Sequence, residues 1–463
     1  MRMKRIAVLS MLLSAIAVYA EGNLRVGAAR LEIPEKLGPS QSGKYDHEHI
    51  YVRAIIIEND TTRAALISTE GGSGGAVAME AVAKELNCPV SNVIISATHT
   101  HSGIAISSTA GVPVSGEHRA EEIGGLDKII ETVRLAKSSL QPARAGYGIG
   151  ASYLSASRDG IDPGTRKWTQ FPNLDAPSDK TVAVLTFEKP TGEPIAAYVN
   201  YAMHPINGLS LNIISGDFPG AMSRYVEKAF GDKAVIAFTQ GASGDQNPLY
   251  LRPRVNALES RSGEPITGFA PTHGLEAAPL SDKGVVYKEA DPAVIDNLFR
   301  FIESEGQVLG EEVIRVMSMT SHWSSDVRIK GEEKEVSCPG RSRINGSAWD
   351  NRTNQGVEGV YADGPPRVYQ IGVLGIGTTA VAWINAEIYT MIGQKAKSEA
   401  PLANTIFSTI SNNGPGGYTP DDASYGRETF EVLDSAVKPG CAETAIVTTV
   451  RDLEEQYLSL NHQ

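Results

Sequence analysis

The sequence repeatedly places a short apolar run directly before a polar loop, with helical stretches between these runs. The runs typical of buried strands are residues 51–58, 63–69, 93–97, 182–187, 195–201, 234–239, 369–374 and 379–384. The stretches with helical character are residues 75–86, 126–140, 217–230, 291–309, 387–398 and 444–460. Because strands that alternate with helices favour the α/β class, we expect a large mixed β-sheet flanked by helices. The sequence predicts one such domain over residues 21–463, without internal repeats.

Two segments interrupt this alternation. Residues 250–285 and 325–366 are rich in proline, glycine and serine and show no clear periodicity. Structureless segments of this length in a compact enzyme often serve as lids or substrate walls. We therefore expect two long loop excursions on the surface of the domain.

The N-terminus has the pattern of a secretory signal peptide. Arg2, Lys4 and Arg5 form a basic head, residues 6–18 are apolar, and small residues surround Ala20. The apolar stretch is shorter than the roughly 20 residues that span a membrane, and no later stretch is long enough. The sequence predicts cleavage after Ala20 and a secreted or periplasmic protein with no transmembrane segment.

Charge and cysteine content limit the partners and the kind of metal site. The formal net charge of −12 argues against nucleic acid and anionic membranes as main partners. Small-molecule, lipid-like or oligosaccharide substrates remain open, and the oligomeric state is not set. The three cysteines, Cys88, Cys338 and Cys441, allow one disulfide and one free thiol. None has zinc-ribbon spacing, so a metal site must use histidine, carboxylate or tyrosine.

Two histidines follow the apolar run at residues 93–97. If the chain stays extended, His99 and His101 point to the same face, where two neutral imidazoles can hold zinc. The alternative is that one ring is packed and the other exposed. His204 repeats the arrangement at the end of the run 195–201, although a single histidine there is commonly structural. Both histidines can contribute to one site because strand ends converge at the edge of a sheet.

Further candidates lie in loops that follow other apolar runs. Asp245 and Asn247 belong to the glycine-rich segment 241–248 and can orient a partner, hold a substrate or simply form a turn. Glu387 follows the run 379–384 and is either a metal ligand or a partner of a helix dipole. Tyr418 is the only large side chain of the turn-rich segment 412–420.

In their order along the chain, these pieces resemble the catalytic domain of the neutral/alkaline non-lysosomal ceramidase family. The resemblance covers roughly residues 24–435. The matching pieces are Val26-Gly27-Ala28-Ala29, Ala97-Thr98-His99-Thr100-His101-Ser102-Gly103, Met203-His204-Pro205, Ser215-Gly216-Asp217 with Gly220, Gly244-Asp245, Glu387 and Gly417-Tyr418-Thr419-Pro420. The resemblance implies the fold of that catalytic domain.

The resemblance also implies a metal centre and roles for individual residues. One catalytic zinc ion is expected to be held by His99, His204, Glu387 and Tyr418, with Tyr425 as the alternative tyrosine. The second histidine of the pair, His101, is then expected to face the substrate as a hydrogen-bonding or proton-transfer group. Arg158, in Ser155-Ala156-Ser157-Arg158, resembles the arginine on the substrate side.

The sequence departs from the family pattern in two places. Asn247 stands where the family has the serine of a Gly-Asp-x-Ser-Pro motif. An amide cannot act as a hydroxyl nucleophile, but it can orient a substrate or an oxyanion. Family members also carry a C-terminal β-sandwich, which is not expected in this chain. We therefore expect a substrate other than classical ceramide.

Three functions are consistent with these residues. The first is a secreted zinc-dependent hydrolase that cleaves an amide or ester bond with metal-activated water. The second is a carbohydrate-active enzyme on the same metal site, either an esterase or a polysaccharide or oligosaccharide lyase in which His101 or Tyr418 moves a proton. The third is a binding protein without catalysis. A new double bond in the product would identify a lyase, and absence of bound metal would favour the third function.

Overall fold

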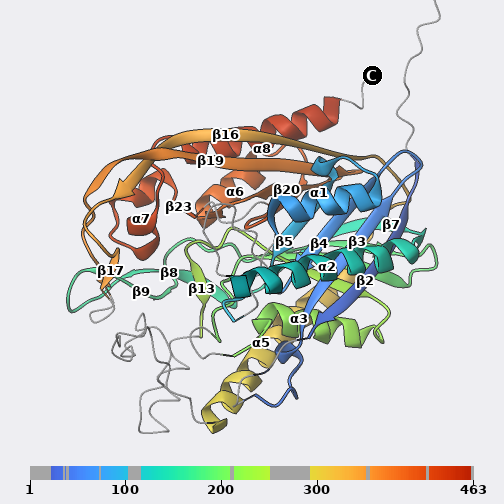
Figure 1. Ribbon diagram of the computed structural model, residues 1–463, viewed down its shortest axis with the longest axis horizontal. Coiled ribbons are helices and arrows are strands. Elements are labelled where there is room, and N and C mark those ends of the chain that lie inside the picture. Colours follow the sequence, from blue (N-terminus) through green and yellow to red (C-terminus); the bar gives the residue numbers. More distant parts are fainter. Residues whose placement is uncertain are drawn as a thin grey trace, which may run out of the picture.

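The computed structural model describes residues 22–34, 37, 41–71, 74–102, 116–208, 213–250, 292–350, 355–412 and 417–459. The expected signal peptide and residues 251–285 of the first expected excursion lie outside these residues. The mixed α/β class is confirmed, but the strands form several sheets rather than one large sheet (Figure 1).

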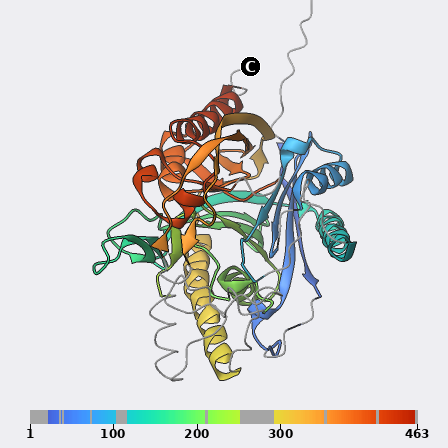
Figure 2. The same ribbon diagram turned by 60° about the vertical axis from the view of Figure 1, so that its left-hand side comes forward.

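Three of the sheets face one another around a shared core (Figure 2). The N-terminal sheet, in the order β5-β4-β3-β2-β6, contains β2 (Arg25–Ile33), β3 (Ile50–Glu58), β4 (Arg63–Thr69), β5 (Val93–Ala97) and β6 (Gln141–Pro142). The middle sheet, in the order β12-β11-β10-β7-β14, contains β7 (Arg144–Ala151), β10 (Thr181–Glu188), β11 (Pro194–Tyr201), β12 (Val235–Gln240) and β14 (Trp323–Ser324). The C-terminal sheet, in the order β16-β19-β20-β22, contains β16 (Ile329–Arg343), β19 (Tyr361–Ile376), β20 (Thr379–Ile384) and β22 (Asn404–Ser408).

Helices cover the outer face of each of these three sheets. Figure 2 shows α1 (Gly75–Leu86) and α2 (Gly116–Ser138) outside the N-terminal sheet. The middle sheet is covered by α3 (Asp217–Ala229) and α5 (Pro292–Met319), and the C-terminal sheet by α6 (Thr390–Glu399) and α8 (Ala442–Ser459).

Side chains alternate along the strands between the shared core and these outer layers. In β3, Ile55 and Ile57 belong to the shared core, while Ile56 packs under α1 and α2. In β20, Val381 and Trp383 face the core, while the intervening residues pack under α6 and α8. Both faces of these strands are therefore buried, which explains why the strands appear in the sequence as apolar runs.

Each of the three sheets contains one parallel pair of strands, and a helix connects the two strands of each pair. The pairs are β4 with β5, β11 with β12, and β20 with β22. The connecting helices are α1, α3 and α6, so the described residues of these three sheets form three β–α–β units. Chain segments that leave the carboxyl ends of such parallel strands are common places for binding sites.

Two local expectations were wrong. The second expected excursion, 325–366, consists largely of strands: β16 and β19 pair over most of their length as a long antiparallel ribbon, with a register shift near Cys338 and Gly340. The expected helix at 387 begins only at Thr390, because Glu387 belongs to the two-residue strand β21 (Glu387–Ile388).

A disulfide joins Cys338 in β16 to Cys441, directly before α8, whereas Cys88 is free. One bridge with one free thiol was the arrangement that the sequence allowed. Across the part of the chain that the structure describes, no helix has the length and apolar character needed to cross a membrane.

Candidate metal centre

The three β–α–β units bring His99, His204 and Glu387 together. His99 follows β5, His204 follows β11 and Glu387 follows β20, each just beyond the carboxyl end of its strand. The carboxylate of Glu387 lies between the two imidazoles, with Oε1 2.6 Å from His204 Nε2 and Oε2 3.6 Å from His99 Nε2. Residues far apart in sequence therefore converge on one point.

The surroundings of His204 fix which of its ring nitrogens faces the centre. The carbonyl oxygen of Gln246 accepts hydrogen bonds from the backbone N–H of His204 and from its Nδ1, at 3.1 and 2.9 Å. A carbonyl accepts only, so the ring proton is on Nδ1 and Nε2 carries a lone pair. Burial lowers the pKa of His204 to about 4, which keeps the ring neutral at physiological pH.

This arrangement leaves two buried acceptor atoms facing each other. Among the residues that the structure describes, neither His204 Nε2 nor Glu387 Oε1 has a hydrogen-bond partner, although both atoms are buried. A lone pair and a carboxylate oxygen 2.6 Å apart repel each other unless a proton or a cation lies near both. Burial opposes the charge of Glu387, yet the adjacent His99 holds the pKa of that carboxyl well below its usual range. The donor set fits a cation such as zinc.

His99 does not continue the strand, contrary to the extended His-x-His that we expected. Its φ angle is 70°, in the left-handed region that residues other than glycine seldom adopt. Two residues of a neighbouring segment share this conformation, Ile410 with φ 51° and Asn412 with φ 57°. The side chain and backbone of Asn412 bind Ile95 in β5, both at 2.8 Å, and hold this segment against the strand. Local strain of this kind is typical of functional sites.

His101 lies on the exposed side of the centre. Its Nε2 is 3.4 Å from His99 Nε2, and its backbone N–H donates to the carbonyl of Pro205, next to His204. The ring nitrogens of His99, His101 and His204 lie within 4.8 Å of one another, so all three could contact a single ion. The exposure of His101 is also consistent with a role towards substrate.

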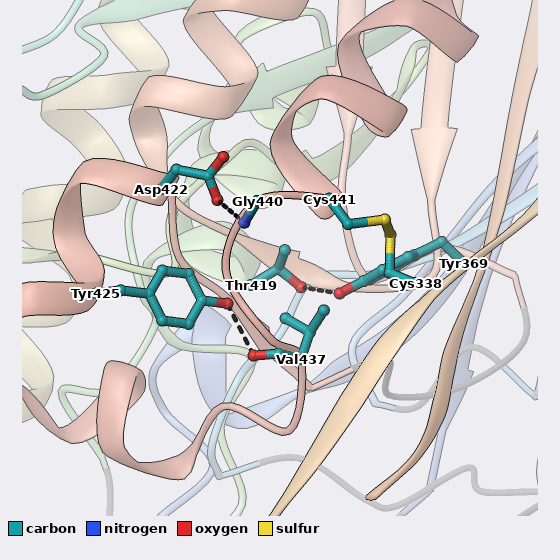
Figure 3. The surroundings of a disulfide bond; sticks show 8 residues. All are labelled: Cys338, Tyr369, Thr419, Asp422, Tyr425, Val437, Gly440 and Cys441. Atoms are coloured by element: carbon teal, nitrogen blue, oxygen red, sulfur yellow. Dashed lines mark hydrogen bonds between the residues drawn. A yellow bond between two sulfur atoms is a disulfide. The ribbon is translucent and has the colours of Figure 1, made fainter. Parts of the chain in front are cut away.

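Tyr418 lies directly beside Glu387. β21 pairs in parallel with β23 (Tyr418–Thr419), and the register sets Glu387 opposite Tyr418. The expected loop therefore contains a short strand at this point. Burial and the nearby Glu387 carboxylate raise the pKa of Tyr418. By contrast, the hydroxyl of Tyr425 donates to the carbonyl of Val437 at 3.1 Å, as Figure 3 shows, which makes Tyr418 the better candidate ligand.

Hydrogen bonds close to the Cys338–Cys441 disulfide hold the segment that carries Tyr418. Figure 3 shows the Thr419 hydroxyl hydrogen-bonded to Tyr369 of β19 at 3.1 Å, close to Cys338. The Asp422 carboxylate accepts from the N–H of Gly440 at 2.7 Å, next to Cys441. The covalent link between β16 and α8 therefore lies alongside the Tyr418 strand.

Arg158 and Asn247, the remaining candidates, lie next to each other beside the centre. Arg158 is in β8 (Ser155–Ile161), which pairs with β13 (Gln246–Pro248), where Asn247 lies. Nη1 of Arg158 donates to the side-chain oxygen of Asn247 at 3.4 Å, and Nη2 is 4.0 Å from Glu387. The guanidinium also lies 5.5 Å from the ring of Tyr418. The structure thus brings together seven of the candidates, His99, His101, His204, Glu387, Tyr418, Arg158 and Asn247.

Some groups that support these residues were not among the candidates in the sequence. The Gln246 carbonyl, which orients His204, gave no signal because any residue supplies a backbone oxygen. Glu431 is fully buried and lies 2.7 Å from Nε of Arg158, but it comes from a distant short helix, α7 (Phe430–Asp434). Asp245 was noted as a hydrogen-bonding residue, and its carboxylate accepts from the backbone N–H of Thr390 at the start of α6.

Gly244 binds β21 through its backbone and so connects the loop that contains Asp245 to that strand. Its backbone N–H donates to the carbonyl of Ile388 at 2.9 Å. A Cβ at this position would lie only 3.0 Å from that carbonyl oxygen, so a larger residue would need the loop and the strand to move apart by a few tenths of an ångström. Glycine therefore fits the close approach between the loop and the strand that carries Glu387.

The buried His47 contacts the loops that form the exposed side of the metal centre. The hydroxyl of Thr100 donates to the Ser215 carbonyl at 2.7 Å, and the backbone N–H of Ser215 donates to the Ser102 carbonyl at 2.8 Å. His47 Nδ1 pairs with the hydroxyl of Ser215 at 2.8 Å. The His47 ring packs edge-on against Phe299 and is fully buried.

The stability of the protein should fall on acidification because of His47. Burial lowers its pKa from 6.5 to about 3, so the unfolded chain binds one proton more than the native state between these values. This group should reduce the free energy of unfolding by about 1.4 kcal/mol for each pH unit below 6.5. Urea unfolding at pH 7, 6 and 5 should show a shallower pH dependence for His47→Gln than for the wild type.

The neighbouring His49 provides the control for this measurement. Its hydrogen bond to Glu32 raises its pKa, so any stability that it contributes is present at low pH and lost as the pH rises. The side chain is partly exposed, and the effect of His49→Gln should be small and opposite in sign. Equal slopes for the wild type and His47→Gln would contradict the assignment.

Comparisons with known proteins show a similarity to one family over about half of the chain. Residues 38–264 match the family described as neutral/alkaline non-lysosomal ceramidase, N-terminal. The chain is 31% identical over 182 residues to neutral ceramidase A of Dictyostelium discoideum and 27% identical over 221 residues to neutral ceramidase of Pseudomonas aeruginosa. Over these residues the chain is similar to the neutral/alkaline non-lysosomal ceramidase family. The alignments cover 38% and 46% of this chain, but only 26% and 32% of the two relatives.

Solved structures extend the likeness in fold beyond the matched region. A structure described as ceramidase complexed with C2 aligns with 95% of this chain and 76% of its own, at a TM-score of 0.69 and 17% identity. The neutral ceramidase from Pseudomonas aeruginosa aligns with 94% and 75%, at a TM-score of 0.66. At this identity the likeness concerns the fold alone.

Proposed function

We propose that this protein is a zinc-dependent hydrolase that cleaves an amide or ester bond. The observation that carries the proposal is the unpaired buried couple of His204 Nε2 and Glu387 Oε1, 2.6 Å apart, with His99 alongside. His99, His204, Glu387 and Tyr418 would hold the ion. When bound, zinc supplies a Lewis acid that polarises an acyl carbonyl and acidifies water.

The residues of the chain supply proton transfer and orientation. His101 is exposed and adjacent to His99, so its imidazole can accept a proton from the attacking water and return it to the leaving nitrogen or oxygen. Tyr418 keeps its proton when no cation is near, because its surroundings raise its pKa. Arg158 and Asn247 line the side of the centre next to Glu387 and present polar hydrogens towards a substrate.

We further propose that the protein is exported and acts on an acylated small molecule. The leader-like pattern of residues 1–20 and the Cys338–Cys441 disulfide both support an oxidising compartment. The family relationship supports a lipid-like substrate. Asn247, in place of the family serine, supports a substrate other than classical ceramide. A panel of N-acyl lipids, O-acyl esters and acylated or acidic oligosaccharides would identify the class.

Removal and return of the metal tests the proposed function. Dialysis against a chelator should remove bound metal and abolish hydrolysis, and addition of zinc should restore both. A ligand present at a thousandfold above its Kd stabilises the native state by about 4 kcal/mol, so the chelated protein should also melt at a lower temperature. The measurements are elemental analysis, release of acyl product and thermal unfolding.

Several outcomes would contradict the proposal. Full activity of the chelated protein, or of His99→Ala, would show that the centre does not carry the reaction. Absorbance from a new double bond in the product would identify a lyase. A protein that binds oligosaccharides but turns over none of the panel would be a binding protein.

A further inference from the structure

Arg158 is a buried cation whose contacts come from three directions. Its side chain is 6% exposed. Nε lies 2.7 Å from Oε1 of Glu431, Nη2 donates to the carbonyl of Gly244, and Nη1 donates to the side-chain oxygen of Asn247. The guanidinium is planar and rigid, so contacts along one edge determine where the other edge points.

The contact with Arg158 determines the orientation of the Asn247 amide. A guanidinium has donors and no acceptor, so it can pair only with the oxygen of the amide. The Nδ2 group of Asn247 must therefore point away from Arg158. Asn247 also follows Gln246, whose carbonyl orients His204, so the amide flanks the metal centre. In this orientation Asn247 offers a hydrogen-bond donor rather than an acceptor.

Glu431 is held in place independently of Arg158. It is fully buried, and its Oε1 accepts a hydrogen bond from Nε2 of Gln170 at 2.9 Å. Its Oε2 accepts from the hydroxyl of Tyr389 at 3.3 Å, and that hydroxyl also contacts Asp159 at 3.2 Å. Because two other residues hold this carboxylate in place, it can fix the position of one edge of the guanidinium.

We propose that Glu431 is a positioning residue that acts through Arg158 to fix Asn247 as a hydrogen-bond donor to the substrate. The inference rests on the proposed hydrolase function and deepens it. A donor at this position recognises a substrate group with a free lone pair, such as an acyl carbonyl or a hydroxyl oxygen. Asn247 thus contributes to specificity, and Glu431, which does not touch the substrate, sets its orientation.

Steady-state kinetics of matched variants tests the proposal. Asn247→Asp replaces the donor by an acceptor and keeps the contact with Arg158, and it should raise KM about tenfold or more. Glu431→Gln removes the charge that anchors Arg158 and should raise KM by about tenfold. Glu431→Asp, which restores the charge, should recover part of this loss. A purely structural defect would instead lower the fraction of active enzyme and leave KM unchanged.

The double variant Asn247→Asp with Glu431→Gln shows whether the two residues share one role or act independently. If Glu431 acts through Asn247, the double variant should have a KM within about twofold of the weaker-binding single variant. Glu454→Gln is the matched control, because Glu454 is equally buried but binds Leu402 and Thr405 at the start of β22. Its KM should match the wild type. An unchanged KM in Glu431→Gln, or fold-changes that multiply in the double variant, would overturn the proposal.

A crystal structure of Glu431→Gln gives a readout that does not depend on activity. The proposal predicts that the guanidinium shifts and that its contact with Asn247 is lost, while zinc content stays at the wild-type level. An unmoved Arg158 would overturn the proposal even if hydrolysis is impaired. If the wild-type protein hydrolyses none of the panel but Arg158 shifts as expected, the proposed function fails and the positioning by Glu431 stands.

Discussion

His204→Gln should empty the candidate metal centre and bring hydrolysis to background. The substitution removes the Nε2 lone pair that faces Glu387 Oε1 and leaves that buried carboxylate without its neighbour. Mutations of groups that only support a metal ligand typically cost 10- to 100-fold. Loss of the ligand itself should exceed that range. Elemental analysis should find little zinc in the purified variant, and the acyl-release assay should give no product above the blank.

His322→Gln serves as the control for this result. His322 is an exposed histidine between α5 and β14, and its replacement should leave zinc content and kcat at the wild-type level. A His204→Gln protein that is folded by circular dichroism and retains stoichiometric zinc would refute the ligand assignment. A folded variant that loses zinc yet keeps its activity would instead refute the catalytic role of the metal.

Arg53→Met should cause the largest loss of stability of any single substitution considered for this protein. Arg53 is 1% exposed and lies between Glu70 and Glu227, with Nε 2.9 Å from Glu227 Oε1 and Nη1 bonded to Glu70. Removal of one partner from a buried ion pair leaves an uncompensated charge and costs about 3–5 kcal/mol. Urea unfolding followed by circular dichroism should show this loss.

Two further variants give this prediction its controls. Arg315→Met breaks a pair with Glu312 on the surface of α5 and should change the free energy of unfolding by about 0.5 kcal/mol or less. The double variant Arg53→Met with Glu70→Leu removes both the cation and one of the stranded carboxylates. It should recover part of the stability, because apolar groups tolerate this environment better than a lone charge. A loss in Arg53→Met no larger than in Arg315→Met would contradict the prediction.

The fold was predictable wherever a segment is buried on both faces. The runs at 63–69, 93–97 and 379–384 and the helix at 75–86 have the bounds that the sequence predicted. The run at 369–374 was predicted and lies in β19, but β16 and the first part of β19 were missed. Many side chains there are exposed and polar, and the pairing depends on a partner strand rather than on periodicity. How the strands divide into several sheets also depends on contacts between distant segments, which local patterns do not encode.

At the site, residue types were predictable but backbone geometry was not. Histidines and a glutamate that follow apolar runs indicated a shared edge, and the structure places them there. The left-handed φ of His99 could not be predicted, since it is imposed by tertiary contacts around Ile95 and Asn412. Glu431 was missed because its partner Arg158 lies far away in the sequence, and a single acidic residue in a short helix gives no signal.

The disulfide matters for how the protein is prepared. The bond between Cys338 and Cys441 closes a segment of 103 residues that contains both Glu387 and Tyr418. Closing a segment of this length lowers the entropy of the unfolded chain by an amount worth about 4–5 kcal/mol in the chain-entropy model. Material produced in a reducing bacterial cytoplasm should therefore contain molecules with both thiols free, an untethered Tyr418 strand and reduced zinc content. Titration of free thiols, with one expected per correctly oxidised chain, would be a simple quality check before any assay is interpreted.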